Sequence, residues 1–258
     1  MTHERRSQIV EMVQKNGMIN NKELMEKFSI SIETVRRDLK YLEDQGYLKC
    51  VYGGAVRIQS EDVRGESPFA YEGVKICHYS EKDAIARAAV KLIQDGDTIF
   101  LDEGTTVLAM SRYLGEVQNV TVITNSIQTA VAMSEVKGCT VVIPGGILRR
   151  GSMSIVGIPE EGGLGRFNID KAFVGVVGIT ETHFTDYPIG GGYLRYQAIR
   201  SSKKTIALAD HSKFGMRAAM NVSRIEELDV VITDTKTEEK HIRRLEQAGV
   251  QVIAAGVE

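Results

Sequence analysis

Cysteine and histidine are scarce in this 258-residue chain, which has three cysteines and five histidines. The cysteines, Cys50, Cys77 and Cys139, are odd in number and widely separated. They fit the reduced, buried thiols of a cytoplasmic protein better than a disulfide framework or a metal site. The histidines show no spacing typical of a metal site, so we expect no structural metal and no cofactor.

Long apolar runs are also missing. The chain begins Met-Thr-His-Glu-Arg-Arg, which lacks the apolar segment of a signal peptide, and no stretch approaches the length of a membrane span. Hydrophobic residues make up 43% of the chain and charged residues 26%, as in soluble globular proteins. We therefore expect a cytoplasmic protein that does not contact a membrane.

A large excess of either charge is absent too, since the net charge is −2. Residues 1–57 carry a net charge of +2 and the rest of the chain a net charge of −4. Any DNA binding therefore has to depend on where the cations lie rather than on their number. One copy of such a domain is expected to bind weakly, so tight binding requires an oligomer on repeated half-sites.

The first 56 residues have the pattern of a winged helix-turn-helix. Apolar residues at helical spacing mark three successive segments: Ile9 and Val13, then Leu24 and Phe28, then Ile32, Val35, Leu39 and Leu42. Ser31 is placed as the N-cap of the third helix, and Gly46 follows its end. Only Ser29-Ile30 separates the second and third helices, so they must cross sharply. Residues 47–56 alternate around Gly53-Gly54, which predicts a hairpin wing.

The outer face of the third segment carries side chains suited to DNA. Arg36 and Arg37 can each make two hydrogen bonds to a guanine edge or pair with a phosphate. The expected DNA-binding set is Ser31, Thr34, Arg36, Arg37, Lys40, Tyr52 and Gly53. A basic pair alone is usually only a solvated helix face. The cap, turn, apolar stripe and wing together favour binding to double-stranded DNA.

The pattern changes after residue 57. Charged and turn-forming residues with little periodicity fill residues 58–76, as in a linker. We therefore predict a DNA-binding domain over residues 1–57, a linker over residues 58–76 and a second domain over residues 77–258.

The second domain alternates helical patterns with short apolar strands. Seven strands are expected, at residues 98–101, 120–123, 140–143, 172–176, 205–208, 230–232 and 250–253. Nearly uninterrupted apolar strands with helices between them indicate a parallel sheet that is buried on both faces. The predicted fold class is α/β: an N-terminal winged helix-turn-helix and a larger, open, mainly parallel α/β domain.

Small polar residues follow these strands, at the edge where open α/β sheets bind ligands. The first strand runs into Asp102-Glu-Gly-Thr-Thr106, whose amides and hydroxyls suit a phosphate at the start of a helix. The expected ligand-binding set is Asp102, Gly104, Thr105, Thr106, Asn125, Ser126, Gly145, Gly146, Arg149, Gly178, Asp210 and Lys213. Each cluster alone is more often a helix cap or a tight turn than a ligand site. Their repetition at successive strand ends favours a small phosphorylated ligand.

Several segments carry a family resemblance: Thr34–Leu39, Tyr52–Ala55, Asp95–Asp102, Gly104–Thr106, Thr124–Ser126, Asp170–Phe173 and Leu208–Gly215. Through them nearly the whole chain resembles transcriptional regulators of the DeoR type, which are repressors of sugar operons. The resemblance implies a sensor domain similar in fold to ribose-5-phosphate isomerase. It also implies a phosphorylated sugar effector that releases the protein from operator DNA, and a homo-oligomer, either a dimer or a tetramer.

One segment departs from that family. Where its members usually have a Glu-rich stretch that ends in Val-Lys, this chain has Thr185-Asp-Tyr-Pro-Ile-Gly-Gly-Gly-Tyr-Leu-Arg195. Arg195 falls at the usual lysine and joins the expected effector-binding set, where it offers a planar fork in place of a point charge. The departure implies an unusual effector, either a phosphorylated sugar or a sugar acid.

A rival interpretation is a sugar-phosphate isomerase or lactonase with an added DNA-binding domain. Isomerisation needs a base beside a carbonyl group. Arg195 stands where the isomerase resemblance would place that base, and no carboxylate lies between Tyr187 and Ser202. Carboxylates elsewhere have simpler roles in binding hydroxyls or capping: Asp102, Glu103, Asp170 and Asp210. We therefore expect a sensor and not an enzyme. A third possibility is a winged helix used for protein contact.

Overall fold

The computed structural model describes residues 2–44, 47–57, 77–149, 152–157, 164–186 and 192–257. The chain divides into two units, Met1–Ser80 with Arg150–Ser152, and Glu81–Arg149 with Met153–Glu258. The expected linker, residues 58–76, lies outside the described residues. The domain boundaries at residues 57 and 77 therefore stay predictions.

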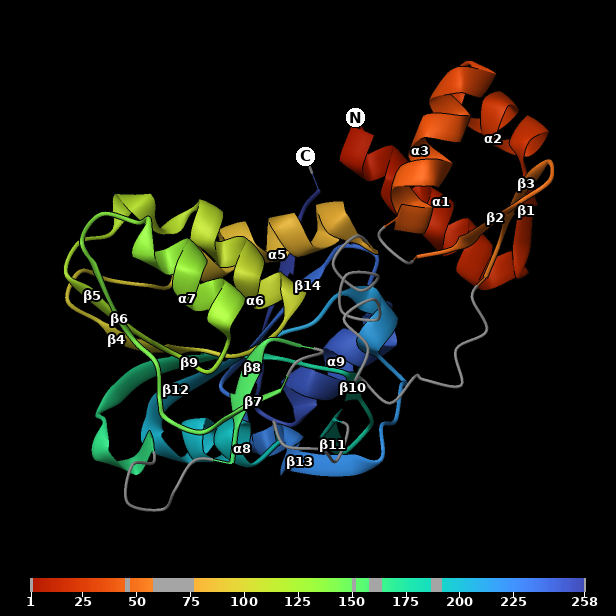
Figure 1. Cartoon of the computed structure of the whole chain (residues 1–258). Helices are drawn as coiled ribbons and strands as arrows, with labels where there is room; N and C mark the ends of the chain where they lie inside the picture. Colours follow the sequence, from red (N-terminus) through yellow and green to blue (C-terminus); the bar gives the residue numbers. More distant parts are fainter. Residues whose placement is uncertain are drawn as a thin grey trace. The chain divides into compact units, whose positions relative to one another are not determined.

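The first unit is a winged helix-turn-helix (Figure 1). Its elements are α1 Thr2–Asn16, β1 Met18–Asn20, α2 Asn21–Phe28, α3 Ile32–Asp44, β2 Lys49–Val51 and β3 Gly54–Val56. The three strands form one antiparallel sheet in the order β1-β3-β2. A side chain at Gly54 would lie 2.0 Å from the Ile19 carbonyl oxygen, so β3 can pair with β1 only because this residue is glycine.

The expected apolar stripes of these helices meet in one core. Its fully buried members include Ile9, Val13, Leu24, Val35, Leu39 and Leu42, and Phe28 and Ile32 pack at its margin. The Thr34 N–H donates to Ser31 Oγ at 3.3 Å, which is the hydrogen bond expected of an N-cap at Ser31. The predicted helix end at Gly46 lies outside the described residues.

The second unit contains a seven-stranded parallel sheet in the order β15-β14-β12-β9-β4-β5-β6. Its strands are β4 Thr98–Leu101, β5 Val120–Thr124, β6 Cys139–Val142, β9 Ile169–Gly175, β12 Ser202–Leu208, β14 Val230–Asp234 and β15 Gln251–Ala255. These are the seven strands predicted from the sequence. The predicted α/β class with a mainly parallel sheet is therefore confirmed.

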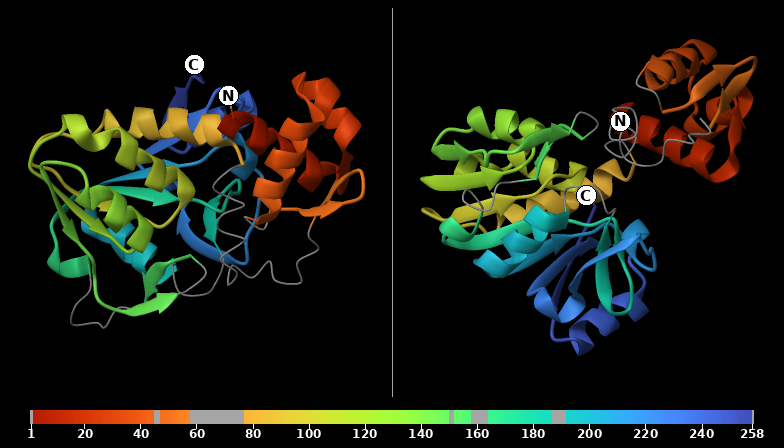
Figure 2. Two further views of the ribbon diagram at one scale, coloured as in Figure 1. Left: turned by 45° about the horizontal axis from the view of Figure 1, so that its top comes forward. Right: turned by 60° about the horizontal axis from the view of Figure 1, so that its bottom comes forward.

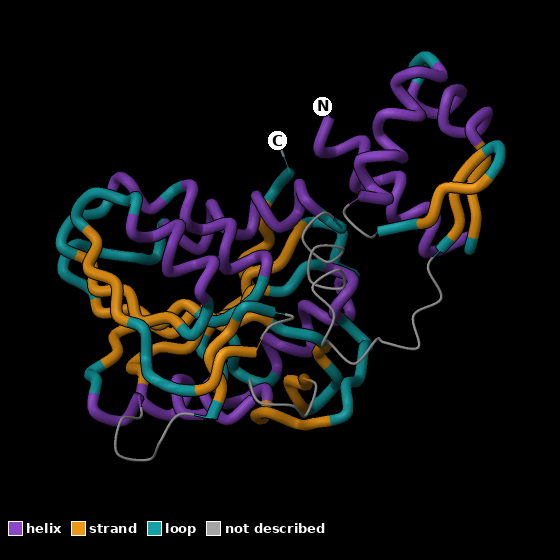
Figure 3. Tube along the Cα trace, viewed as in Figure 1, coloured by secondary structure: helices purple, strands orange, loops and turns teal. Residues whose placement is uncertain are grey.

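Helices cover both faces of this sheet (Figures 1 and 3). One face is covered by α5 Tyr79–Val90, α6 Thr105–Ala109 and α7 Ile127–Ser134, and the other by α8 Gly192–Ser201 and α9 Glu239–Gln247. Alternate residues of β4 enter the two cores: Leu101 packs with Ile85 of α5, and Phe100 packs with Ala198 of α8. The sheet is therefore buried on both faces, as its apolar strands require.

Shorter strands lie outside the main sheet (Figure 2). β10 Gly178–Ile179, β11 His183–Asp186 and β13 Met220–Arg224 form an antiparallel sheet, and β7 Ile147–Arg149 pairs with β8 Ser154–Val156. The second unit also contains short 3-10 helices at Met110–Arg112, Leu114–Glu116, Leu164–Arg166, His211–Lys213 and Ile225–Glu227. The sequence analysis did not predict these elements.

The strand order reverses between β4 and β9. From β4 the chain proceeds to β5 and β6 on one side of the sheet, whereas β9, β12, β14 and β15 lie on the other side. In open parallel sheets, ligands bind beyond the carboxyl ends of the strands at such a reversal. The loops after β4 and β9 therefore mark the expected ligand site.

Cys50, Cys77 and Cys139 are thiols, and each is only partly buried. The sequence predicted buried thiols, but the burial is partial because each cysteine lies at the margin of an apolar core, Cys50 and Cys77 in the first unit and Cys139 in the second. Within the described residues, no helix combines the length and apolar character that crossing a membrane requires.

Candidate DNA-binding and effector sites

The outer face of α3 presents the basic pair that the sequence singled out. Arg36 and Arg37 are exposed, while their neighbour Val35 is buried in the core. Within the described part of the chain, neither arginine makes an ion pair. Both guanidinium groups are therefore available to bases or phosphates.

The remaining DNA-contact candidates lie at the two ends of this surface. Ser31 is exposed and Thr34 is half-buried at the start of α3. Lys40 contacts Glu43 at 3.2 Å and Asp44 at 2.9 Å, and hydrogen bonds to these carboxylates raise the pKa of Lys40. Exposed ion pairs of this kind are weak, so a phosphate can compete for the ammonium group.

The wing offers an exposed aromatic side chain. Tyr52 is fully exposed at the tip between β2 and β3. Gly53 beside it has a φ of +84°, a conformation that favours glycine. Nothing in the described first unit covers the Tyr52 ring, so it is free to contact DNA.

The sequence analysis missed Asp38, which lies between Arg37 and Leu39 on α3. Its carboxylate is 1% exposed and accepts hydrogen bonds from Arg5 Nε at 2.6 Å and Arg6 Nε at 2.8 Å. The available signal was a charged residue next to an apolar stripe, with two adjacent arginines on another helix of the same small domain.

The loop after β4 contains the residues that we expect to bind a phosphate. Thr105 and Thr106 are each 8% exposed, and α6 begins behind Gly104, which has a φ of +144° and makes no side-chain cap. A side chain at Gly175, which ends β9, would lie 3.0 Å from the Glu103 carbonyl oxygen. The two loops at the strand-order reversal therefore approach each other closely, and no described side chain caps the start of α6.

Two of the predicted effector residues bind each other. Arg195 of α8 donates from Nε to the Asp102 carboxylate and from Nη1 to the Asp186 carboxylate. Asp102 also accepts the Gly175 N–H at 3.1 Å, and its side chain is completely buried. The Arg195 fork is therefore occupied by two carboxylates and does not point to solvent as a free cation.

Burial raises the pKa of Asp102 to about 7, although the Arg195 guanidinium opposes this rise. The nearby carboxylates of Glu103 and Asp186 add to the rise. Burial also works against the charge of Arg195, but the Asp102 and Asp186 carboxylates outweigh it and raise the Arg195 pKa. The permanently charged Arg195 guanidinium thus binds two carboxylates. Of these, the Asp102 carboxylate keeps its proton up to nearly neutral pH.

The end of β5 contains a buried amide without a partner. Asn125 is 0% exposed, and neither its Nδ2 nor its Oδ1 atom has a hydrogen-bond partner among the described residues. Its main-chain oxygen accepts the Ile155 N–H of β8 at 2.7 Å, which holds the residue in place. Ser126 is also buried, but it caps α7 by accepting the Thr129 N–H at 3.1 Å. Native proteins rarely leave a buried amide unsatisfied.

The predicted glycines beyond β6 and β9 have structural explanations. A side chain at Gly146 would lie 2.7 Å from the Val156 carbonyl oxygen, and one at Gly178 would lie 2.4 Å from the Met216 carbonyl oxygen. Gly145 has open space around its Cα, and Arg149 ends β7 half-buried. Close backbone approach is therefore sufficient reason for two of these glycines.

The end of β12 holds the last predicted residues. Asp210 is buried and accepts the Ser212 N–H at 3.0 Å, so it caps the turn that contains the half-buried Lys213. The sequence analysis missed Asp234 at the end of β14, which is fully buried and accepts the His211 N–H at 2.7 Å. This bond ties the turn after β12 to the neighbouring strand.

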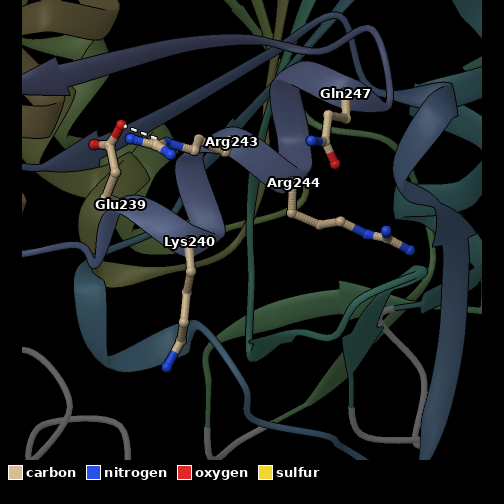
Figure 4. A pocket seen from close by; sticks show the side chains of 5 residues that line it. All are labelled: Glu239, Lys240, Arg243, Arg244 and Gln247. Atoms are coloured by element: carbon tan, nitrogen blue, oxygen red, sulfur yellow. Dashed lines mark hydrogen bonds and ion pairs between the residues drawn. The ribbon is translucent and has the colours of Figure 1, made fainter.

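A surface pocket lies on α9, a helix that contains none of the predicted effector residues. It is lined by Glu239, Lys240, Arg243, Arg244 and Gln247 (Figure 4). Arg243 donates to Glu239 at 3.0 Å, and Lys240 contacts Glu238 at 2.6 Å. Much of the charge on this helix is therefore neutralised within the helix.

Comparisons with known proteins match both units. A family model described as DeoR-like helix-turn-helix domain matches residues 5–61, and one described as DeoR C terminal sensor domain matches residues 77–235. The HTH-type transcriptional regulator GolR of Listeria innocua is 32% identical over 250 residues, which cover 96% of this chain and 97% of the relative. The HTH-type transcriptional repressor GlcR of Bacillus subtilis is 33% identical over 256 residues, which cover 97% and 95%.

Solved structures show a weaker likeness. Ribose 5-phosphate isomerase A from Methanocaldococcus jannaschii is 24% identical over 52% of this chain and 53% of that chain, with a TM-score of 0.37. A TM-score this low supports no argument about chemistry or ligand.

Proposed function

Since this chain belongs to the DeoR family of transcriptional regulators and is a DNA-binding protein rather than an enzyme, we propose that it represses a carbohydrate-utilisation operon. In this proposal a phosphorylated sugar or sugar acid releases it from the operator. The relative GlcR is named a transcriptional repressor, which supports repression over activation. We also propose the cytoplasm as its location, because operator DNA lies there in the bacteria from which its relatives come.

The unpartnered amide of Asn125 is the observation that carries the effector half of this proposal. An amide needs both a donor and an acceptor, and a sugar hydroxyl provides both. A phosphate dianion only accepts, so it satisfies Nδ2 but leaves Oδ1 without a donor. The ligand group that we assign to Asn125 is therefore a hydroxyl.

The phosphate is assigned to the loop after β4. Among the described residues no side chain caps the start of α6, where Thr105 and Thr106 contribute hydroxyls. Because β4 and β5 are neighbours in the sheet, their carboxyl ends are adjacent. A sugar phosphate that extends from one strand end to the next would satisfy both sets of groups.

The Asp102–Arg195–Asp186 cluster gives this site no spare positive charge. With both carboxylates ionised, the three side chains carry a net negative charge. A phosphate therefore has to obtain its cation elsewhere, and Lys213 after β12 is the candidate that we favour. The cluster itself presents carboxylate oxygens, which suit sugar hydroxyls.

We propose release by a population shift. An oligomer without effector holds two DNA-binding units at the spacing of the half-sites, and the effector stabilises a state in which this spacing is lost. The effector achieves this only if it binds the two states with different affinities. The segment 58–76, which we expect to be a linker, lies outside the described residues.

Contacts inside the first unit suggest where the signal enters it. The His78 N–H donates to Glu11 Oε1 at 3.1 Å, and the His3 and Tyr79 rings stack with centroids 5.5 Å apart. Glu11 and His3 belong to α1, while Tyr79 is the first residue of α5, a helix that continues into the sensor sequence. Residues 78 and 79 therefore contact α1 within the first unit, which offers a route besides the linker.

Isothermal titration calorimetry with a panel of sugar phosphates and sugar acids tests the proposed effector class. We expect one compound to bind the wild type and to lose affinity when Asn125 is replaced by Leu. The matching compound without its phosphate should bind more weakly to the wild type. If every phosphorylated compound fails to bind, the proposed effector class is wrong.

A further inference from the structure

α3, the helix that we expect to contact DNA and here call the recognition helix, is held by two arginines of α1. Arg5 and Arg6 of α1 each donate from Nε to a different oxygen of the Asp38 carboxylate, at 2.6 Å and 2.8 Å. The Asp38 side chain is 2% exposed, and the arginine side chains are 19% and 15% exposed. A carboxylate this deeply buried needs its partners, since losing one is strongly destabilising.

Arg6 holds α3 at a second point. Its guanidinium carbon lies 3.8 Å from the centroid of the Tyr41 ring. Tyr41 follows Asp38 by three residues, so both lie on the same side of α3 about one turn apart. One arginine therefore contacts two successive turns of the recognition helix.

The rest of the contact between α1 and α3 is apolar. Ile9 and Val13 of α1 belong to the same core as Val35 and Leu39 of α3. Apolar burial is non-directional and tolerates small rotations of one helix against another. The planar guanidinium groups of Arg5 and Arg6 bind a carboxylate only in restricted geometries, so they fix the rotation of α3.

That rotation determines where the DNA-contacting side chains point. Successive residues of an α-helix are turned by about 100°, so Arg36 and Lys40 each lie about 200° from Asp38. Anchoring Asp38 toward α1 therefore directs Arg36 and Lys40 to the opposite face. The exposure of both side chains agrees with this geometry.

We propose that Asp38, held by Arg5 and Arg6, is a positioning residue for sequence-specific DNA recognition. It fixes the rotation of α3 so that Arg36 meets base edges on the face opposite α1. Non-specific attraction to DNA does not need this precision, because it depends on charge rather than on the direction of each side chain. This inference concerns the first unit alone and does not depend on the identity of the effector.

The test compares two affinities of the full-length protein. The specific probe is a duplex selected by the wild type from a random pool, and the non-specific probe is a scrambled duplex of the same composition. We expect Asp38→Asn to weaken binding to the selected duplex roughly ten- to a hundredfold, the range of one to two bidentate base contacts. Binding to the scrambled duplex should be unchanged or tighter, because the variant has lost a negative charge.

Glu26→Gln is the matched control, because it removes the same charge from an exposed side chain of α2 in the same unit. It should leave the ratio of the two affinities unchanged. A second variant, Arg5→Lys with Arg6→Lys, keeps the net charge but replaces the planar forks. It should lower the ratio as well, and circular dichroism should show that it remains folded.

A purely structural role for Asp38 predicts a different pattern. Binding to both duplexes would then fall together, in proportion to the loss of folded protein. An unchanged ratio in the folded double-lysine variant would overturn the positioning role. So would an unchanged ratio in Asp38→Asn.

Discussion

Arg195 of α8 forms a buried ion pair with Asp102 at the end of β4, with side chains that are 4% and 0% exposed. The same guanidinium binds Asp186 of β11. Arg195 stands at the position where we expected a cation for the effector. In the structure its charge is used to join α8 to the end of β4 and to β11.

The first prediction concerns pH. The ordinary pKa of a carboxyl like Asp102 is 3.8, and burial raises it to about 7. Between these values the folded protein keeps a proton that the unfolded chain has lost, so the Asp102 contribution to stability falls as pH rises. The fall is at most about 1.4 kcal/mol per pH unit and ends above about pH 7.

Urea unfolding of the wild type and Asp102→Asn at pH 5, 6, 7 and 8 measures this contribution. The difference in free energy of unfolding, wild type minus variant, should decrease from pH 5 to pH 7 and then level off. Thr182→Ala, an exposed position whose side chain carries no charge, should show no such trend. A difference that stays constant across this range would contradict the raised pKa.

The second prediction concerns Asn125. Replacing it by Leu removes two buried polar atoms that lack partners, so the free energy of unfolding without ligand should rise by about 1 kcal/mol. The same variant should lose its affinity for the sugar phosphate that the wild type selects. Asn221→Leu, at an exposed position, should change neither quantity by as much. Reduced stability together with normal effector binding would show that the amide serves the fold alone.

The third prediction concerns the loop after β4. Thr105→Ala with Thr106→Ala should weaken effector binding roughly tenfold or more, since each hydroxyl is assigned a hydrogen bond to a charged phosphate. Operator affinity without effector should be unchanged. Thr182→Ala, an exposed control, should behave as the wild type. If effector still releases the double variant from operator normally, the assignment of the phosphate to the loop after β4 is wrong.

The fourth prediction concerns the basic pair of α3. Arg36→Ala with Arg37→Ala should weaken operator binding by at least roughly thirtyfold, because each arginine is assigned about 1–3 kcal/mol of base recognition. Effector binding should be unaffected. Lys15→Ala removes an exposed cation from the end of α1 and should have a small effect on operator affinity. Retained operator affinity in the double variant would favour a winged helix that contacts protein.

The fifth prediction concerns the contact between α1 and the start of α5. Glu11→Ala removes the acceptor of the His78 N–H. The variant should bind operator and effector as tightly as the wild type, but the effector should reduce its operator affinity less. Gel-shift titrations with and without effector measure this coupling. If effector releases the variant from operator as fully as the wild type, the signal must pass through the segment 58–76 or by another route.

The main sheet could be predicted from the sequence because each strand carries its own signal. Val120–Thr124 and Val230–Asp234 are apolar runs between helical patterns, and burial on both faces demands that composition. The sheet of β10, β11 and β13 has no such signal. It pairs His183 with Arg224 through short strands, and the sequence between these residues does not encode the pairing locally.

The sequence predicts where the residues of the candidate site lie, but not which of their side chains bind each other. Strand ends such as Asp102 and Asn125 are found by counting strands, because parallel strands place their carboxyl ends at one edge. Which groups bind each other depends on the approach of α8 to β4, and Asp102 lies 93 residues before Arg195. The pairing of Asp38 with Arg5 and Arg6 escaped prediction for the same reason, because helix packing determines it.

Fluorescence anisotropy of labelled operator DNA, titrated with the protein and then with a panel of sugar phosphates and sugar acids, decides whether an effector releases this regulator from DNA. The DNA is taken from the region upstream of the gene for this protein. We expect tight binding that one phosphorylated compound abolishes, while the same sugar without phosphate has little effect. Tight binding that no compound in the panel alters would contradict the effector-released repressor and leave only the DNA-binding regulator.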